Sequence, residues 1–143
     1  MKVTLILDQN REEELIIYAH KESNLTDSIK KLVSEQRDSL IGYSEDEIIP
    51  LSILEIHCFT VESNKIYALT DNSKLLIKNR LYKIEESLPD SFVKINQSCI
   101  VNINKIERFS TAISGSLTVR LKNGYCDYVS RRNLKNVKER LGL

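Results

Sequence analysis

The first forty residues change from β-type to helical spacing of their hydrophobic side chains. Lys2–Leu7 alternates between apolar and more polar positions, and Glu14–His20 is a second run rich in β-favouring residues, with turn-forming residues between the two. From Asn24 onward the apolar side chains follow one helical stripe, made of Leu25, Ile29, Leu32, Val33 and Leu40. We therefore expect a hairpin-like pair of strands and a helix that packs on it.

The polar, glycine-bearing stretch at 42–47 is the best candidate for a linker. It divides the chain into a segment at 1–44 and a larger unit at 45–143. Up to residue 47, Lys and Arg number 6 against 11 Asp and Glu, a balance of −5, while the remainder carries 15 against 9, a balance of +6. This asymmetry suggests an acidic attachment on a basic module, and a basic module is suited to a polyphosphate partner.

Beyond the linker, short β-type runs follow one another at close spacing. Most are separated by turn residues, of which Asn123-Gly124 is the strongest hairpin signal. Short helices are expected at 80–88, where Pro89 ends the pattern, and at 131–141. The pattern predicts a mainly β fold with sheets in a sandwich or barrel-like arrangement, and the β runs are Ile53–Val61, Lys65–Leu69, Leu75–Lys78, Phe92–Ile95, Lys105–Thr111, Leu117–Leu121 and Tyr125–Val129.

The composition is that of an ordinary globular protein. The 143 residues are 41% hydrophobic and 29% charged, with a mean hydropathy of −0.27, so one core can form without a disulfide or a metal. No apolar run approaches the length that spans a bilayer, and no signal-peptide core follows the first residues, so we expect a cytoplasmic protein. Cys58, Cys99 and Cys126 lack metal-ligand spacing, and we expect three buried free thiols.

No pattern of catalytic residues is present in the sequence. There is no nucleophile elbow, phosphate loop, dinucleotide fingerprint or H-E-x-x-H helix. The only histidines are His20 and His57, and a strand would point His57 and Cys58 to opposite faces. We therefore expect no enzymatic activity, no cofactor, no metal and no small-molecule substrate.

Polar and basic residues gather at the strand ends of the second half. An arginine can donate two parallel hydrogen bonds to guanine, an asparagine or glutamine can pair with adenine, and a lysine neutralises phosphates. These residue types favour double-stranded DNA as a partner, and the set comprises Asn64, Lys65, Lys94, Asn96, Gln97, Lys122, Asn123, Arg131, Arg132 and Lys135.

The order of residues at 92–106, FVKINQSCIVNINKI, resembles the F-x-R-x-H-x-S-x-x-V-N-x-x-x-I signature of the LytTR family of DNA-binding domains. Upstream, the run at 81–88 is similar to the family helix L-x-x-L-E-x-x-L. Downstream, the stretches at 121–124 and 129–135 resemble its closing hairpin and S-R-R element. The resemblance covers about residues 48–143, and the signature positions that match are Ser98, Val101, Asn102 and Ile106.

The resemblance implies an elongated, ten-stranded β fold that inserts loops, and no recognition helix, into the major groove of DNA. Carried over position by position, it implies that bases are read by Asn64 or Lys65, Asn96, Gln97 and Arg132. It implies phosphate contacts from Lys94, Arg131 and Lys135. Asn96 stands where the family has His and Lys94 where it has Arg, so a bidentate phosphate clamp is not expected at 94.

The acidic segment at 1–44 is too short for the receiver domain that many LytTR proteins carry, so we expect a stand-alone, response-regulator-like bacterial transcription regulator. Its edge strands are suited to dimerisation or to binding another partner. The family implies a homodimer on repeated DNA sites and a membrane-protein inhibitor. The alternative is a protein-interaction module that sequesters another regulator without binding DNA itself.

Overall fold

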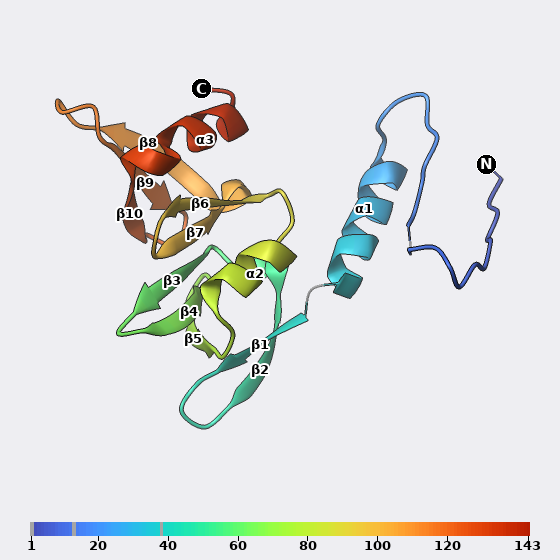
Figure 1. Ribbon diagram of the computed structural model, residues 1–143, viewed down its shortest axis with the longest axis horizontal. Helices are drawn as coiled ribbons and strands as arrows, with labels where there is room; N and C mark the ends of the chain where they lie inside the picture. Colours follow the sequence, from blue (N-terminus) through green and yellow to red (C-terminus); the bar gives the residue numbers. More distant parts are fainter. Residues whose placement is uncertain (1, 13, 38) are drawn as a thin grey trace.

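The computed structural model describes residues 2–12, 14–37 and 39–143, with side chains for these residues outside 34–39. The described chain forms three α-helices, α1 (Asn24–Arg37), α2 (Leu81–Ser87) and α3 (Arg131–Leu141), together with ten strands (Figure 1) and two short 3₁₀ helices at Ile53–Glu55 and Ile103–Lys105. The strands are β1 (Ser39–Tyr43), β2 (Ile48–Ser52), β3 (Cys58–Glu62), β4 (Lys65–Leu69), β5 (Lys74–Ile77), β6 (Phe92–Asn96), β7 (Cys99–Asn102), β8 (Ile106–Thr111), β9 (Leu117–Leu121) and β10 (Cys126–Val129).

The strands form two antiparallel sheets, which confirms the predicted mainly β fold. The larger sheet has the order β2-β1-β5-β4-β3-β7-β6 and the smaller one the order β10-β9-β8. Every strand pairing is antiparallel. Helix α3 packs on β6 and β10, so it lies where the two sheets meet (Figure 1).

Strands β3, β6 and β7 lie between two hydrophobic cores. On β3, Cys58 belongs to the core shared with the small sheet, while Phe59 belongs to the core under α2. Likewise Ile100 on β7 faces α2, and its neighbours Cys99 and Val101 face the small sheet. A strand buried on both faces needs apolar residues at successive positions, which is why these strands show no polar and apolar alternation.

The predicted linker at 42–47 is instead part of the larger sheet. Gly42 lies in β1 opposite Ile49 of β2, and the polar residues after it form the turn of this hairpin. Helix α1 ends at Arg37, so Leu40, which we expected on the helical stripe, is in β1. Gly42 is required by packing: a Cβ there would lie 2.9 Å from both Leu51 Cδ1 and Leu75 Cβ.

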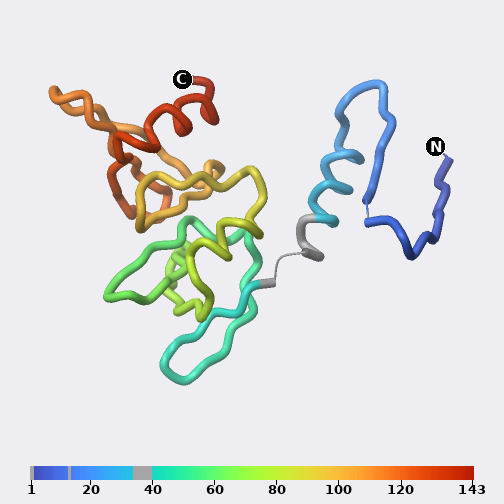
Figure 2. The backbone as a smooth tube through the Cα atoms, in the orientation of Figure 1, coloured from blue at the N-terminus to red at the C-terminus, as the bar shows by residue number. Residues whose placement is uncertain are grey.

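The strand pair expected at Lys2–Leu7 and Glu14–His20 is not formed by the described residues. The chain here runs as an open trace beside α1 (Figure 2), whereas the expected helix is present. An isolated two-stranded hairpin is only marginally stable in water. Because most of the large apolar side chains of these two runs remain exposed, the described residues form no core that would hold the runs together.

The substitution Gly42→Ala is expected to lower the free energy of unfolding by about 1–3 kcal/mol, because the added methyl overpacks the contact with Leu51 and Leu75. Ser44→Ala, at an exposed position of the same hairpin, should change it by less than about 0.5 kcal/mol. Urea denaturation of the two variants measures both values. Equal midpoints would show that the sheet tolerates a side chain at position 42.

Candidate nucleic-acid interface

Three connections that carry predicted DNA-contacting residues lie side by side. The β6–β7 turn lies beside the end of β3, just before the β3–β4 turn, because the Val61 amide of β3 donates to the Ser98 carbonyl at 2.9 Å. The end of β6, just before the β6–β7 turn, lies beside the start of α3, because the Ser130 amide donates to the Ile95 carbonyl at 2.8 Å. The β3–β4 turn, the β6–β7 turn and the first turn of α3 therefore form a row, which we call the three-loop row.

The β3–β4 turn holds its tip residues in the left-handed region. Ser63 has φ 49° and Asn64 has φ 61°, the conformation of a type I′ hairpin turn. Asparagine tolerates this region better than most residues, and both Asn64 and Lys65 are exposed. The turn therefore presents two polar side chains at one end of the row.

The two amide side chains at the β6–β7 turn lie in different environments. Asn96 is only 2% exposed: its Oδ1 accepts from the Ser98 amide at 2.8 Å, and its Nδ2 donates to the Tyr128 carbonyl at 2.9 Å. Gln97, by contrast, is exposed at the tip. Asn96 thus shapes the turn and ties it to β10, and Gln97 is the residue of the pair that faces solvent.

Helix α3 contributes the cationic end of the row. Arg131, Arg132 and Lys135 are all exposed on its first turns. The helix is anchored by Val137, which is fully buried, and by Arg140, whose guanidinium donates to the Phe92 carbonyl at 2.9 Å. The basic side chains therefore project from a fixed helix.

Lys94 occupies a different environment from the other predicted phosphate contacts. Its ammonium lies 3.7 Å from the Glu85 carboxylate of α2. It is half-buried and lines a cavity of about 260 Å³ between α2 and α3. The ion pair with Glu85 was not expected from the sequence; the only signal was the acidic residue pair on the predicted helix.

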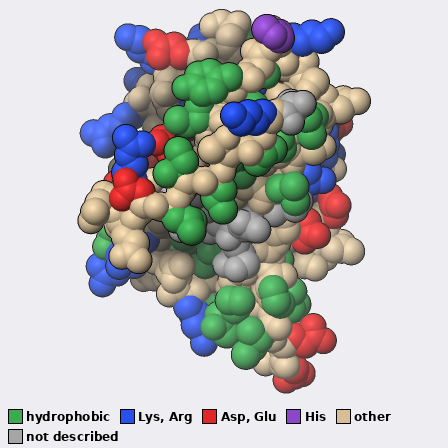
Figure 3. Space-filling view, turned by 90° about the vertical axis from the view of Figure 1, so that its right-hand side faces the viewer, with side chains coloured by type: hydrophobic (Ala, Val, Ile, Leu, Met, Phe, Trp, Pro, Cys, Tyr) green, Lys and Arg blue, Asp and Glu red, His purple; other side chains and the backbone are tan. Residues whose placement is uncertain are grey.

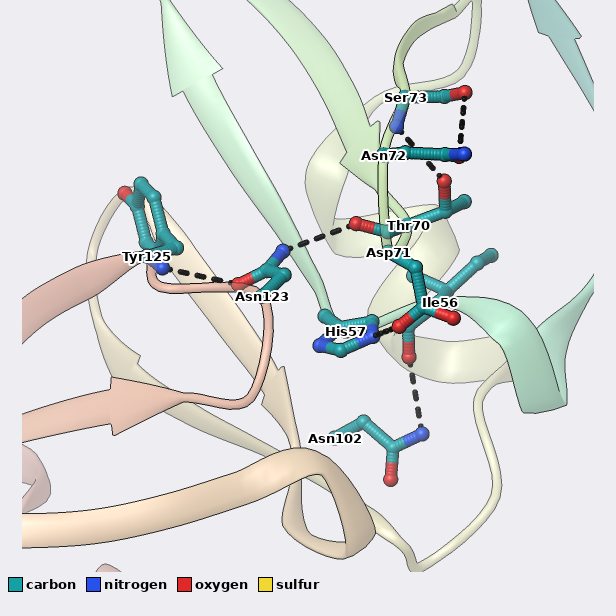
Figure 4. A network of polar contacts seen from close by, with 9 residues as sticks. All are labelled: Ile56, His57, Thr70, Asp71, Asn72, Ser73, Asn102, Asn123 and Tyr125. Atoms are coloured by element: carbon teal, nitrogen blue, oxygen red, sulfur yellow. Dashed lines mark hydrogen bonds and ion pairs between the residues drawn. The ribbon is translucent and has the colours of Figure 1, made fainter.

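A polar network joins the two sheets away from the row (Figure 4). Asn123, in the β9–β10 turn, donates through Nδ2 to the Thr70 carbonyl at 3.1 Å and accepts from the Tyr125 amide at 3.0 Å. Asn102 donates to the Ile56 carbonyl at 3.0 Å and caps the turn after it by accepting from the Asn104 amide. Asn123, which we included in the DNA-reading set by type, therefore joins the sheets.

The ring of His57 and the thiol of Cys58 have separate partners. His57 is buried, and its Nε2 lies 2.6 Å from Asp71 Oδ1 (Figure 4).

A hydrogen bond with the Cys58 thiol, together with burial, raises the pKa of Cys99, which keeps the Cys99 thiol protonated. The expectation of three buried thiols was wrong for Cys126, which is exposed because it lies with Tyr128 on the solvent-facing side of β10, opposite to the side of the buried Val129.

No helix in the described part of the chain is long and apolar enough to cross a membrane. Within the same residues, no cluster of three or more His, Cys, Asp or Glu side chains is arranged to bind a metal ion.

A mainly β unit that presents exposed amide and basic side chains on adjacent loops has the features of a DNA-binding domain, and comparison with known proteins identifies its family. The family model described as the LytTr DNA-binding domain matches residues 46–142. A solved LytTr DNA-binding domain from Bacillus cereus superimposes with a TM-score of 0.69 at 24% identity, covering 74% of this chain and 99% of that one. The chain belongs to the LytTR family.

Curated relatives match over the whole length. A protein of Staphylococcus aureus strain NCTC 8325, named an uncharacterized HTH-type transcriptional regulator, is 35% identical over 100% of this chain and 99% of its own. A relative with the same type of name from the bovine strain RF122 is 36% identical over the same shares. These matches include the first 37 residues, so the acidic segment has a counterpart in the relatives.

The adjacent residues Asn96 and Gln97 should differ sharply in their effect on stability. Asn96→Ala leaves the Ser98 amide and the Tyr128 carbonyl without their partner, and should lower the free energy of unfolding by about 1–3 kcal/mol. Gln97→Ala, at an exposed site, should change it by less than about 0.5 kcal/mol. Chemical denaturation measures both, and a larger loss for Gln97→Ala would contradict the assigned roles.

Proposed function

We propose that the protein is a DNA-binding transcription regulator that recognises double-stranded DNA sequence-specifically through the three-loop row. The observation that carries the proposal is that hydrogen bonds at the ends of β3 and β6 bring the β3–β4 turn, the β6–β7 turn and the start of α3 into one row. Each of them presents exposed side chains of the types that read bases or bind phosphates. Family membership and the names of the relatives support the same function.

In this proposal the loops enter the major groove, where each base pair shows a distinct pattern of donors and acceptors. Gln97 and Arg132 read bases from adjacent loops, and Asn64 or Lys65 reads from the third. Arg131 and Lys135 bind phosphates and fix the register of the protein on the duplex. Asn96 is a positioning residue, because the two hydrogen bonds of its buried amide are spent on holding the turn.

The proposal places the protein in the cytoplasm as a homodimer on a repeated site, since one row reads only a short stretch of DNA. A membrane-protein inhibitor stays a prediction of the family resemblance. Crosslinked pull-down from native cells tests it, and recovery of no membrane protein would count against it.

The direct test selects bound fragments from a random duplex pool and measures the affinity of the winner by fluorescence anisotropy. Arg132→Ala should cost about 1–3 kcal/mol of binding free energy and relax the preference at one base pair. Lys135→Ala should weaken all sequences alike and reduce the salt slope by about one unit. Identical behaviour of the two variants would show that Arg132 does not read a base.

The second candidate function is a protein-interaction module that sequesters another regulator. Two observations favour this module: Asn96 is buried and Lys94 forms an ion pair, so fewer polar side chains are available to contact DNA. DNA binding through five or six phosphate contacts should weaken about 10³-fold between 50 and 200 mM salt. A protein partner held by apolar contacts should barely respond, and no enrichment from the pool at low salt would favour the module.

Glu85 is expected to restrain DNA binding by holding Lys94. Glu85→Gln removes the charge 3.7 Å from the ammonium and should strengthen binding about two- to fivefold, with a steeper salt slope. Glu86→Gln is the matched control, because this residue is the next one on α2 and forms no ion pair with a described residue. An equal gain in both variants would mean that Lys94 takes no part.

A further inference from the structure

The segment that precedes β1 exposes an unusual amount of apolar side chain. The exposed fraction runs from 37% for Val33 to 92% for Tyr18. Seen from the side that carries the N-terminal residues, hydrophobic side chains run down the middle of the surface with charged ones around them (Figure 3). The large apolar side chains of residues 2–33 that contribute are Val3, Leu5, Ile6, Leu7, Leu15, Ile16, Tyr18, Leu25, Leu32 and Val33.

The number of residues in this segment is comparable to that on one side of an interface between two chains. A monomer rarely exposes a continuous apolar patch beyond a few hundred Å². A stable interface buries about 800 Å² per partner and uses roughly 20–30 residues on each side. The ten side chains are spread over a segment of about that length, so covering them needs a partner of comparable extent.

The backbone of Glu14–Ala19 is available for pairing. These residues lie outside every helix and strand, and in the described part of the chain their amides and carbonyls bond to no other segment. The run Leu15-Ile16-Ile17-Tyr18 has high β-propensity. A segment with an unpaired backbone and high β-propensity can pair as a strand with another chain.

The charges on the two sides of this run point to a second copy as the occupant. Glu12, Glu13 and Glu14 precede it, and His20 and the cationic Lys21 follow it, with Glu22 next. Antiparallel pairing of two copies sets the acidic end of each against the basic end of the other, whereas parallel pairing sets like charges side by side. The segment is thus complementary to itself in one orientation.

We propose that two copies of this chain dimerise by antiparallel pairing of residues 14–20, with Ile17 opposite its own copy on the two-fold axis. A two-fold axis through such a pair must pass between identical residues. With Ile17 there, Glu14 lies opposite His20 of the second copy, and Ile16 lies opposite Tyr18. The apolar stripe of α1 then covers the paired strands.

The neighbouring register, with Ile16 on the axis, is less favourable. It sets Arg11 opposite Lys21, and like charges directly opposite each other destabilise a strand pair. The proposed register sets Glu12 opposite Glu22, but Lys30 already neutralises Glu22 within its own chain at 2.8 Å. This inference deepens the proposed homodimer, and it holds or fails independently of DNA binding.

The test measures self-association of the full chain by sedimentation equilibrium without DNA. Wild type should be dimeric at micromolar concentration. Ile17→Lys and Ile17→Glu should each raise the dimer dissociation constant at least about 100-fold, because two like charges meet on the axis and two buried isoleucines are lost. A mixture of the two variants should regain dimer, since Lys then faces Glu. Ile113→Lys and Ile113→Glu, at a fully exposed hairpin tip, are the controls and should stay dimeric.

The outcomes separate this inference from the proposed function. A monomeric wild type, or variants at 17 that stay dimeric, would overturn the inference. Single variants that are monomeric and do not associate when mixed would overturn the register, and a protein that needs a different partner would behave in this way. Fluorescence anisotropy with a duplex that carries one half-site measures DNA binding by each variant. A variant that no longer dimerises but still binds the half-site would be consistent with the proposed function.

Discussion

The structure depends on three strands that are buried on both faces. β3, β6 and β7 carry one core toward α2 and another toward the small sheet. The two turns of the three-loop row project from these same strands, and α3 reaches the row because it packs on β6 through the fully buried Val137. The position of the candidate DNA-contacting side chains is therefore set by core packing, with the Asn96 amide as the polar link between the β6–β7 turn and β10.

Much of the β unit could be predicted from the sequence. The strands at Lys65–Leu69 and Leu117–Leu121 and helix α3 are found at the expected residues, because alternation, turn residues and helical spacing agree there. The hairpin of β1 and β2 was missed, because Gly42 and the acidic residues after it have the composition of a linker. Gly42 is instead required by close packing against Leu51 and Leu75. The local sequence around Gly42 does not indicate such a contact, because Leu75 is distant in the sequence.

The candidate DNA-binding site could also be predicted only in part from the sequence. The residue types indicated the three loops, and the structure brings those loops together. The sequence could not distinguish Asn96 from Gln97, because both are amides at a turn and only burial separates their roles. Nor could it show that Lys94 faces Glu85, since that contact joins a strand to a helix whose relative placement depends on the core.

The part of the acidic segment before β1 differs from the β unit because its described residues contribute to neither hydrophobic core. Its helix is amphipathic and its two β-type runs stay open, and in the proposed dimer its apolar side chains are covered by the second copy. A regulator that reads DNA through short loops gains affinity when two copies are linked, because the second site is then bound at high effective concentration. In the two proposals, the exposed segment joins two copies and the three-loop row binds DNA, so the two parts have complementary roles.

The central claim is that the β3–β4 turn, the β6–β7 turn and the start of α3 contact DNA together. Amide hydrogen exchange, measured by mass spectrometry with and without saturating selected duplex, tests it most directly. The account predicts that exchange slows in all three segments, at 62–66, 96–98 and 130–133, and is unchanged in the β1–β2 turn at 44–47. Slowed exchange elsewhere, with these three segments unchanged in the bound state, would contradict it.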